Sequence, residues 1–159
     1  MTMVKKNDAV AGKIKILLDK QPLAVLATQG DGQPYTSLMA YAFTEDLRFL
    51  VVATAMSTRK HRNITGESRV ALLVDDRSNN VEDFQNAAAL TIVGEACKVG
   101  IDERDYYSGL YLKRHPSLET FLASPSTVFF KIEVHNYLLV SRFENVVEYQ
   151  IKDEKSLST

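Results

Sequence analysis

Short apolar runs separated by turn-forming residues recur along most of this 159-residue chain, and they constrain its fold more than any other feature. Because many strands with tight turns and few helices favour a closed or nearly closed antiparallel barrel, which hides its strand edges, we expect a mainly β (α+β) fold of about six to seven strands. The tripeptide Gly30-Asp31-Gly32 predicts a hairpin turn. The predicted strands are residues 23–28, 34–43, 47–53, 69–76, 88–99, 127–141 and 143–151.

Helical patterns are confined to a few peripheral segments. Residues 8–19 predict a helix capped by Asn7 or Asp8 and ended by Pro22. A second helical stretch, residues 102–123, is broken by Pro116, and residues 77–86 are polar and turn-like. Helical spacing also places four aromatic side chains in core or dimer packing: Tyr106, Tyr107, Tyr111 and Phe121.

Composition indicates one ordinary globular domain, residues 1–159, with a frayed tail at 152–159. Hydrophobic residues make up 45 % of the chain and charged residues 25 %, which is enough for a single core without disulfides. Apolar runs are far shorter than the ~20 residues of a membrane span, and the N-terminal residues lack the apolar core of a secretory signal. We therefore expect a cytoplasmic protein that does not bind membranes.

Charge and cysteine content exclude some classes of function. A net charge of −1 argues against a general nucleic-acid binder. The single cysteine, Cys97, has no partner for a disulfide or a zinc site and is predicted to be a small buried hydrophobe. The three histidines are scattered, so no metal site is expected.

Four cationic or ionisable residues, Arg59 to Arg62, directly follow a predicted strand. Ser57 and Thr58 are good caps for a helix over residues 59–65. Cations in a first helical turn interact unfavourably with the helix dipole, which costs roughly 0.3 to 1 kcal/mol unless an anion is bound there. A phosphate held by Arg59 and Lys60 would resolve the conflict.

The alternative is a solvated helix face, with Arg59, Lys60 and Arg62 paired to carboxylates such as Glu67. The sequence contains neither a Walker motif nor GxGxxG, so a bound phosphate would belong to another kind of cofactor.

Four segments, GQPYTSLMAYAF, LRFLVVATAMSTRKHRNI, RVALLV and LTIVGEA, resemble in order and spacing the flavin-binding split-barrel family that includes pyridoxamine 5′-phosphate oxidase. The resemblance covers about half of the chain. It implies an antiparallel split β-barrel that binds FMN at the interface of a homodimer, with the FMN phosphate at the strand-to-helix turn.

The resemblance also implies site residues. Arg59 and Lys60 match the family's phosphate-binding pair, and Thr58 and Thr54 match its hydroxyl residues, with Ser57 beside them. Residues Ser37, Leu38 and Met39 match the strand segment that passes along the flavin. Asn86 and its neighbour Gln85 precede the fifth predicted strand, so they are expected at the polar edge of the flavin, with a role as turn residues as the alternative. If the dimer resembles that of the family, Arg142 with Phe143 is expected to reach the partner's flavin.

Several positions depart from the oxidase itself. Ser37 stands where the oxidase usually has arginine, Ala42 where it has lysine, and Ala89 where it has glutamine. The arginine-rich C-terminal signature of that enzyme is also missing. The chain therefore resembles a relative of the oxidase, with the phosphate site kept and the pyridoxamine phosphate site altered.

The leading hypothesis is an FMN-dependent oxidoreductase that acts on an unidentified small molecule, with an electron donor such as NAD(P)H. A non-catalytic flavin carrier or redox sensor remains open. So do a haem-binding relative that uses His61 or His135 and a relative that binds the deazaflavin F420.

Overall fold

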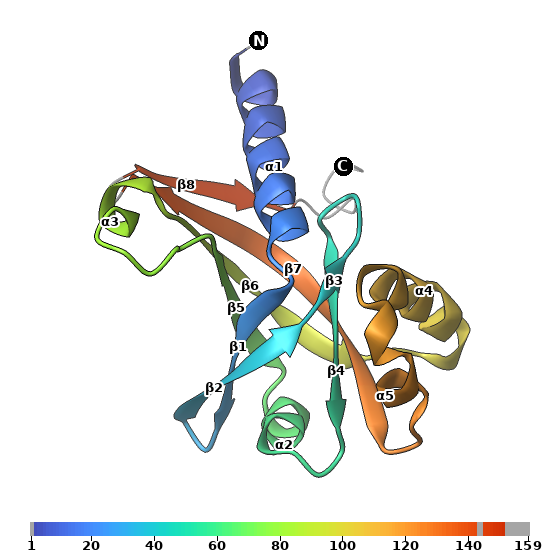
Figure 1. Ribbon diagram of the computed structural model, residues 1–159. Helices are drawn as coiled ribbons and strands as arrows, with labels where there is room; N and C mark the ends of the chain where they lie inside the picture. The colour runs from blue at the N-terminus through green and yellow to red at the C-terminus, as the bar shows by residue number, and fades with distance from the viewer. Residues whose placement is uncertain (1, 143–144, 152–159) are drawn as a thin grey trace, which may run out of the picture.

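The computed structural model describes residues 2–142 and 145–151, and its strands form one antiparallel sheet. Their order is β2-β1-β5-β6-β7-β4-β3, and β8 pairs with β7 beside this path (Figure 1). The strands are β1 (Leu23–Gly30), β2 (Gln33–Ala40), β3 (Ala42–Phe43), β4 (Phe49–Ala55), β5 (Arg69–Asp75), β6 (Ala88–Lys98), β7 (Thr127–Ser141) and β8 (Asn145–Gln150). The helices are α1 (Thr2–Lys20), α2 (Arg59–Gly66), α3 (Asp83–Asn86), η1 (Ile101–Glu103), α4 (Arg104–Arg114), η2 (Pro116–Leu118) and α5 (Glu119–Ala123).

Tyr41 joins the two ends of this sheet. It separates β2 from β3, which stand at opposite ends of the strand order although they are consecutive in the chain. Its side chain is fully buried, and its hydroxyl donates to the backbone oxygens of Leu18 and Gln21 at the end of α1. The predicted single strand over residues 34–43 is therefore interrupted here, because the chain leaves β1 and turns to pair with β4. The sheet is a barrel that is split between β2 and β4, as expected.

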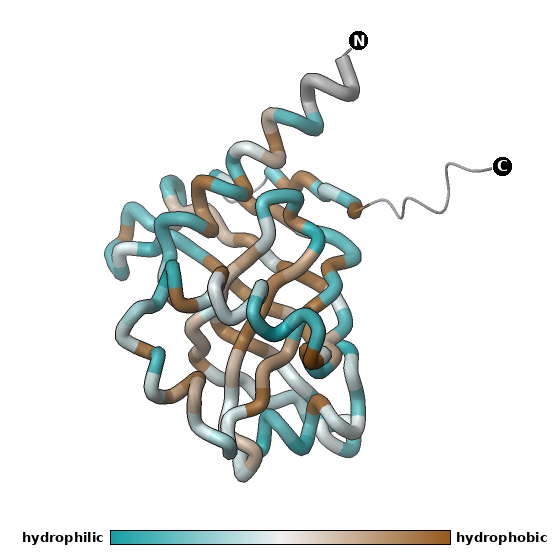
Figure 2. Tube along the Cα trace, turned by 90° about the vertical axis from the view of Figure 1, so that its right-hand side faces the viewer, coloured by the Kyte–Doolittle hydropathy of each residue, from teal (hydrophilic) through white to brown (hydrophobic). Residues whose placement is uncertain are grey.

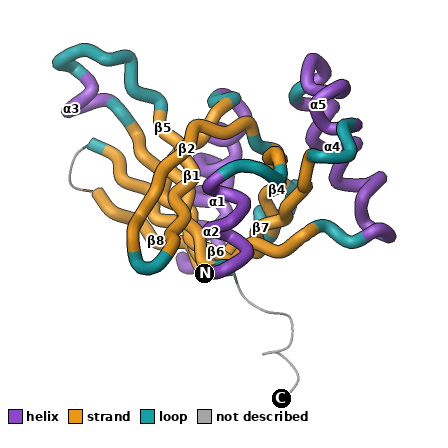
Figure 3. The backbone as a smooth tube through the Cα atoms, turned by 90° about the horizontal axis from the view of Figure 1, so that it is seen from below, coloured by secondary structure: helices purple, strands orange, loops and turns teal. Residues whose placement is uncertain are grey.

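Two helices fill opposite ends of the barrel. α1 lies at one end and α2 at the other in Figure 1, and both fall inside the outline of the strands when seen from below (Figure 3). The apolar stripe of α1 packs into the same core as Ile64 of α2 and the inward residues of the strands. Apolar residues accordingly gather along the strands, and polar residues gather at the turns (Figure 2). The stripe consists of Val10, Ile14, Leu17 and Leu18.

A second, smaller core lies on the outer face of β3, β4 and β7. Tyr107 and Tyr111 of α4 and Leu122 of α5 pack there against Val51 and Phe129. β4 and the first part of β7 are therefore covered on both faces. No helix of this second core covers β1, β2 or β5, and Leu38 and Leu73 remain 67 % and 36 % exposed on that side.

Three expectations need correction. The first helix begins at Thr2, six residues before its predicted start. Leu47 lies in a turn with a φ of 62°, so the third predicted strand begins later, at Phe49. Cys97 is exposed rather than buried, because the side chains of β6 alternate and its neighbour Ala96 takes the inward position.

Other expectations are confirmed. The hairpin turn at Asp31 and Gly32 has φ angles of 51° and 77°, as a tight turn of the left-handed type requires. The polar stretch 77–86 is mostly irregular and ends in the four-residue helix α3. The last predicted strand appears as β8, whereas Phe143 lies outside the described residues.

No helix in the described part of the chain has the length and apolarity needed to cross a bilayer.

Candidate cofactor site

Thr58 caps the basic helix α2. Its backbone is extended, and its hydroxyl oxygen accepts from the N–H of His61 at 3.3 Å. The same hydroxyl donates to the Ala55 carbonyl at 2.9 Å, so the Thr54 hydroxyl, also 2.9 Å away, acts as a donor to Thr58. Two buried or half-buried hydroxyls are thus fixed between the end of β4 and the start of α2. Ser57, the other predicted cap, is exposed.

Within the part of the chain that the structure describes, no acidic side chain neutralises the cations that follow this cap. Arg59 is exposed and Lys60 is half-buried. Over residues 7–142 and 145–151, no carboxylate lies within ion-pair distance of Arg59, Lys60 or Arg62. Glu67, the expected partner in the alternative of a solvated helix face, instead pairs with Arg69 at 2.7 Å. The helix start therefore carries the electrostatic conflict that the sequence predicts.

An aromatic ring orients Arg59. Its guanidinium carbon lies 4.9 Å from the centre of the Tyr35 ring in β2, within the range of a cation–π contact. The contact holds Arg59 against β2, one of the strands that border the split, and no group among the described residues accepts from its guanidinium N–H groups. The sequence alone does not point to Tyr35, because this contact depends on where the hairpin lies relative to α2.

The open edge of β2 faces the split. β2 pairs only with β1 among the described strands, and a two-residue turn joins them. In such a hairpin alternate residues bond to the partner strand, so Ser37 and Met39 bond to β1 while Leu38 turns its N–H and C=O outward. Met39 is buried in the core and Ser37 is half-buried. Of these three predicted residues, Leu38 thus offers both a free backbone edge and an exposed apolar side chain.

Asn86 and Arg142 lie at the other end of the molecule. Asn86 ends α3, and Arg142 follows β7 in a left-handed conformation with a φ of 49°. Ala88 and Ser141 pair across β6 and β7, which places Asn86 and Arg142 near each other and far from α2 (Figure 1). One chain therefore does not bring them to the basic turn.

The histidines do not form a common site. The His61 ring lies 5.8 Å from the Phe130 ring, and His135 is exposed on β7. Within residues 7–142 and 145–151, no group of three or more His, Cys, Asp or Glu side chains is arranged to hold a metal ion.

Two further residues fix α2 against the sheet. The amide of Asn63 donates to the Thr28 hydroxyl at 3.0 Å, and both side chains are buried. Hydrophobic periodicity does not reveal such a contact, since both residues are polar. Only the proximity of the hairpin and the helix in the fold identifies it.

Comparison with known proteins agrees with this architecture. Residues 10–141 match the sequence model of the pyridoxamine 5′-phosphate oxidase family. No curated protein matches the sequence. A haem-binding protein from Mycobacterium smegmatis has a TM-score of 0.79 at 16 % identity; the match covers 88 % of this chain and 57 % of that protein.

Two other solved structures share the fold along most of both chains. A protein from Clostridium acetobutylicum, related to general stress protein 26 of the pyridoxinephosphate oxidase family, has a TM-score of 0.68 at 15 % identity, over 89 % of this chain and 94 % of that one. An FAD-binding protein from Mesorhizobium loti has a TM-score of 0.64 at 19 % identity, over 81 % and 90 %. Since the family match spans most of the residues, the chain belongs to the pyridoxamine 5′-phosphate oxidase family.

Proposed function

We propose that this protein binds FMN between the open edge of β2 and the start of α2, and that it is a flavin-dependent oxidoreductase acting on a small molecule. The observation that carries the proposal is the pair Arg59 and Lys60, which stand unneutralised in the first turn of a helix. A phosphate dianion there would satisfy the helix dipole and both cations at once.

The residues present fit the phosphate of this cofactor. Arg59 supplies a planar fork of N–H donors and Lys60 an ammonium group, and both types of side chain bind phosphate well. The Thr54 and Thr58 hydroxyls bond to each other, and Thr58 caps the N–H of His61 alone. The other N–H groups in the first turn of α2 are therefore available to a phosphate. This chain would thus hold the phosphate with groups that are in place before binding.

The open edge of β2 suits the flavin ring. The outward N–H and C=O of Leu38 would pair with polar atoms of the ring, and the exposed Leu38 side chain would cover part of its face. When bound, the flavin would supply the hydride or electron transfer, whereas the protein would orient it and exclude water. The described chain therefore needs no dedicated acid or base beside the ring.

We also propose a homodimer. Leu38, Val25 and Leu73 stand side by side in the registers of β2, β1 and β5, on the outer face that α4 and α5 leave uncovered. Such an apolar row on a sheet favours pairing with a second copy. The partner would close the open side of the flavin site, and Asn86 and Arg142 of that partner would reach the flavin that they cannot reach within one chain.

The test is cofactor binding by the purified protein and by the double variant Arg59→Ala with Lys60→Ala. We expect visible absorption bands of a flavin, release of FMN identified by mass, and an affinity for added FMN that falls by at least about a hundredfold in the variant, because two charge-assisted contacts are lost. A matched control removes one arginine and one lysine elsewhere, Arg77→Ala with Lys98→Ala, and should leave affinity unchanged. An affinity that stays within about twofold in the Arg59 and Lys60 variant would refute the phosphate site.

Turnover separates the enzyme from a flavin carrier. An oxidoreductase that is reduced by NAD(P)H passes the electrons to an acceptor repeatedly, whereas a carrier or sensor is reduced without sustained turnover. Because structural neighbours include proteins described as FAD-binding and haem-binding, the released cofactor should be identified by mass before turnover is assayed. Release of haem or F420 would replace the proposed flavin chemistry.

A further inference from the structure

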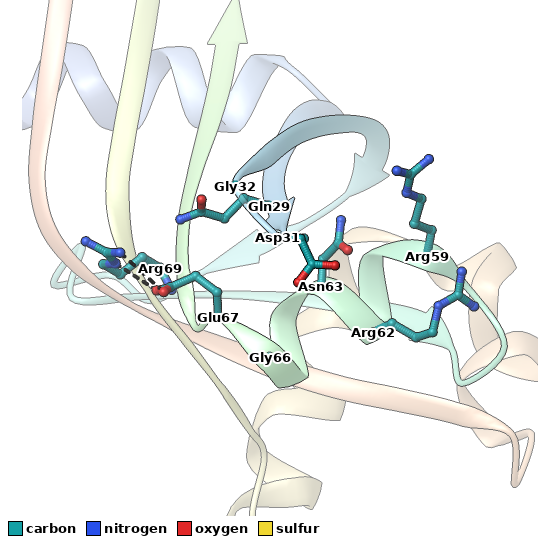
Figure 4. A pocket seen from close by; sticks show the side chains of 10 residues that line it. Gln29, Asp31, Gly32, Arg59, Arg62, Asn63, Gly66, Glu67 and Arg69 are labelled. Atoms are coloured by element: carbon teal, nitrogen blue, oxygen red, sulfur yellow. Dashed lines mark hydrogen bonds and ion pairs between the residues drawn. The ribbon is translucent and has the colours of Figure 1, made fainter.

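A polar pocket of about 610 Å³ lies between the β1–β2 hairpin turn and the side of α2. One wall is the turn from Gln29 to Gly32, and the other is the helix face that carries Arg59, Arg62 and Asn63 (Figure 4). Glu67 and Arg69 line the pocket where the chain enters β5. Its volume is in the range of small-molecule sites, and Arg59 lines this pocket as well as the proposed phosphate site.

The two ends of the pocket differ in charge. Arg59 and Arg62 stand one helical turn apart on α2 and form a cationic end. At the other end Arg69 and Glu67 neutralise each other through two bonds of 2.7 and 3.2 Å. Asp31 lies between these ends in Figure 4, and no cation in the described part of the chain lies within ion-pair distance of it.

The walls of the pocket are held in place before any ligand arrives. The bond from Asn63 to Thr28 ties α2 to β1. Gly30 approaches Asn63 so closely that a Cβ at this position would overlap the amide oxygen. The contact of Arg59 with Tyr35 links the cationic end to β2. A ligand would therefore meet a largely formed site, which lowers the entropy cost of binding.

We propose that this pocket binds a nucleoside monophosphate group next to the flavin phosphate. Arg62 would take the phosphate, with Arg59 shared between the two phosphates, and the Asp31 carboxylate would accept from the sugar hydroxyls. The base would lie by the Gln29 amide and the planar Arg69–Glu67 pair, which offer donors, acceptors and a stacking surface. This assignment rests on the proposed flavin site, because Arg59 connects the two.

A nucleoside monophosphate could have two sources. It is the adenylate half of FAD, which continues directly from the flavin phosphate, or it is a free nucleotide that binds beside FMN. Both present the same phosphate, sugar and base to the pocket. The experiment must therefore compare linked and unlinked forms.

The first measurement is the affinity of the apoprotein for FMN and for FAD by flavin fluorescence, and its affinity for AMP by calorimetry with FMN bound. We expect FAD to bind more tightly than FMN by on the order of tenfold, as one added charge-assisted contact would give. Arg62→Ala should abolish this advantage and leave FMN affinity within about twofold. Arg48→Ala, at a half-buried arginine between β3 and β4, is the matched control and should change neither affinity.

The second measurement tests the sugar contact. AMP should bind more tightly than 2′,3′-dideoxy-AMP, and Asp31→Asn should remove that difference, because the amide no longer attracts two hydroxyl donors as a carboxylate does. Asparagine tolerates the left-handed conformation of Asp31, so this variant is expected to fold.

The outcomes are distinct. An FAD advantage that depends on Arg62 supports the adenylate half of FAD as the source. Equal FMN and FAD affinities with Arg62-dependent AMP binding support a free nucleotide. Normal FMN binding with neither an FAD advantage nor AMP binding overturns this inference while the proposed flavin site stands. If FMN itself does not bind, the proposed function fails first.

Discussion

The side-chain amide of Asn63 donates to the hydroxyl of Thr28 at 3.0 Å, and this bond joins the basic helix α2 to the first strand of the barrel. Asn63 is 7 % exposed and Thr28 is 4 % exposed, so water does not easily replace either partner. The position of Arg59, Lys60 and Arg62 relative to the β1–β2 hairpin depends on this contact.

Thr28→Val should therefore destabilise the fold. Valine has the shape of threonine but leaves the buried amide of Asn63 without its acceptor, which costs about 1–3 kcal/mol. Thr28→Ser keeps the hydroxyl and should cost clearly less. Chemical denaturation of the three proteins measures this difference. Equal losses in both variants would show that the methyl group, rather than the hydrogen bond, matters at this position.

Gly94→Ala should be strongly destabilising. Gly94 lies at the irregularity in the pairing of β6 with β7, and a Cβ there would overlap the backbone carbonyl oxygen of Glu133. Since that oxygen belongs to a strand in the middle of the sheet, it cannot move cheaply, and we expect a loss of about 2 kcal/mol or more.

Gly109→Ala is the matched control for this prediction. Gly109 lies within α4, and an added methyl group there would meet open space, so alanine should stabilise the helix by about 0.5–1 kcal/mol. Thermal unfolding of both variants gives the signs directly. A Gly94→Ala variant that is as stable as the unaltered protein would contradict the prediction, because β6 and β7 would then move apart at the irregularity without loss of stability.

Because of Tyr41, the stability of the fold should decrease with rising pH in the alkaline range. Burial raises the pKa of Tyr41 to about 12, although the Arg114 guanidinium beside it acts in the opposite direction. An unfolded tyrosine has a pKa near 10, so the neutral hydroxyl is preferred in the fold. Its stabilising contribution is complete below about pH 10 and is lost as the pH rises from about 10 through about 12.

Comparison with Tyr41→Phe isolates this effect from the other buried tyrosines, Tyr111 and Tyr137. At pH 8 the phenylalanine variant should be less stable, because it lacks the bonds to the end of α1. The difference in the free energy of unfolding between the two proteins should decrease by about 2 kcal/mol as the pH approaches 12. Urea titrations at several pH values measure it, and a gap that does not change with pH would contradict the assignment.

Charge on the uncovered face should separate the proposed dimer. Leu38→Asp and Leu73→Asp place carboxylates in the middle of the apolar row, and across a two-fold interface each charge would be buried without a partner. We expect light scattering to report a dimer for the unaltered chain and a monomer for either variant. Val81→Asp, at a loop residue that is 80 % exposed, is the control and should leave the protein dimeric. A variant at Leu38 that remains dimeric would place the interface elsewhere.

Much of the fold follows from local sequence signals. Alternating residues and turn glycines locate β1, β5, β6 and β7 closely, because these strands bury one face and their turns need particular backbone angles. The break at Tyr41 does not follow from such signals. It depends on α1 and β4, which are distant in sequence, and the stretch on both sides of it remains β-forming.

The candidate site divides in the same way. The cap at Thr58 and the cations after it are local features, and the sequence predicts them correctly. The contacts of Tyr35 and Asn63 are long-range and polar, so neither hydrophobic pattern nor motif points to them. The prediction of a buried Cys97 is wrong because an apolar neighbourhood does not tell which face of a strand a residue occupies.

The order of the strands has a consequence for synthesis on the ribosome. β4 is apolar along its length, and it pairs with the first half of β7, which leaves the ribosome long after it. Until then β4 has only the two-residue β3 as a partner, and the split barrel cannot close through Tyr41. A nascent chain that stops before β7 therefore exposes the apolar, unpaired edge of β4. We expect such truncated chains to bind chaperones or to aggregate.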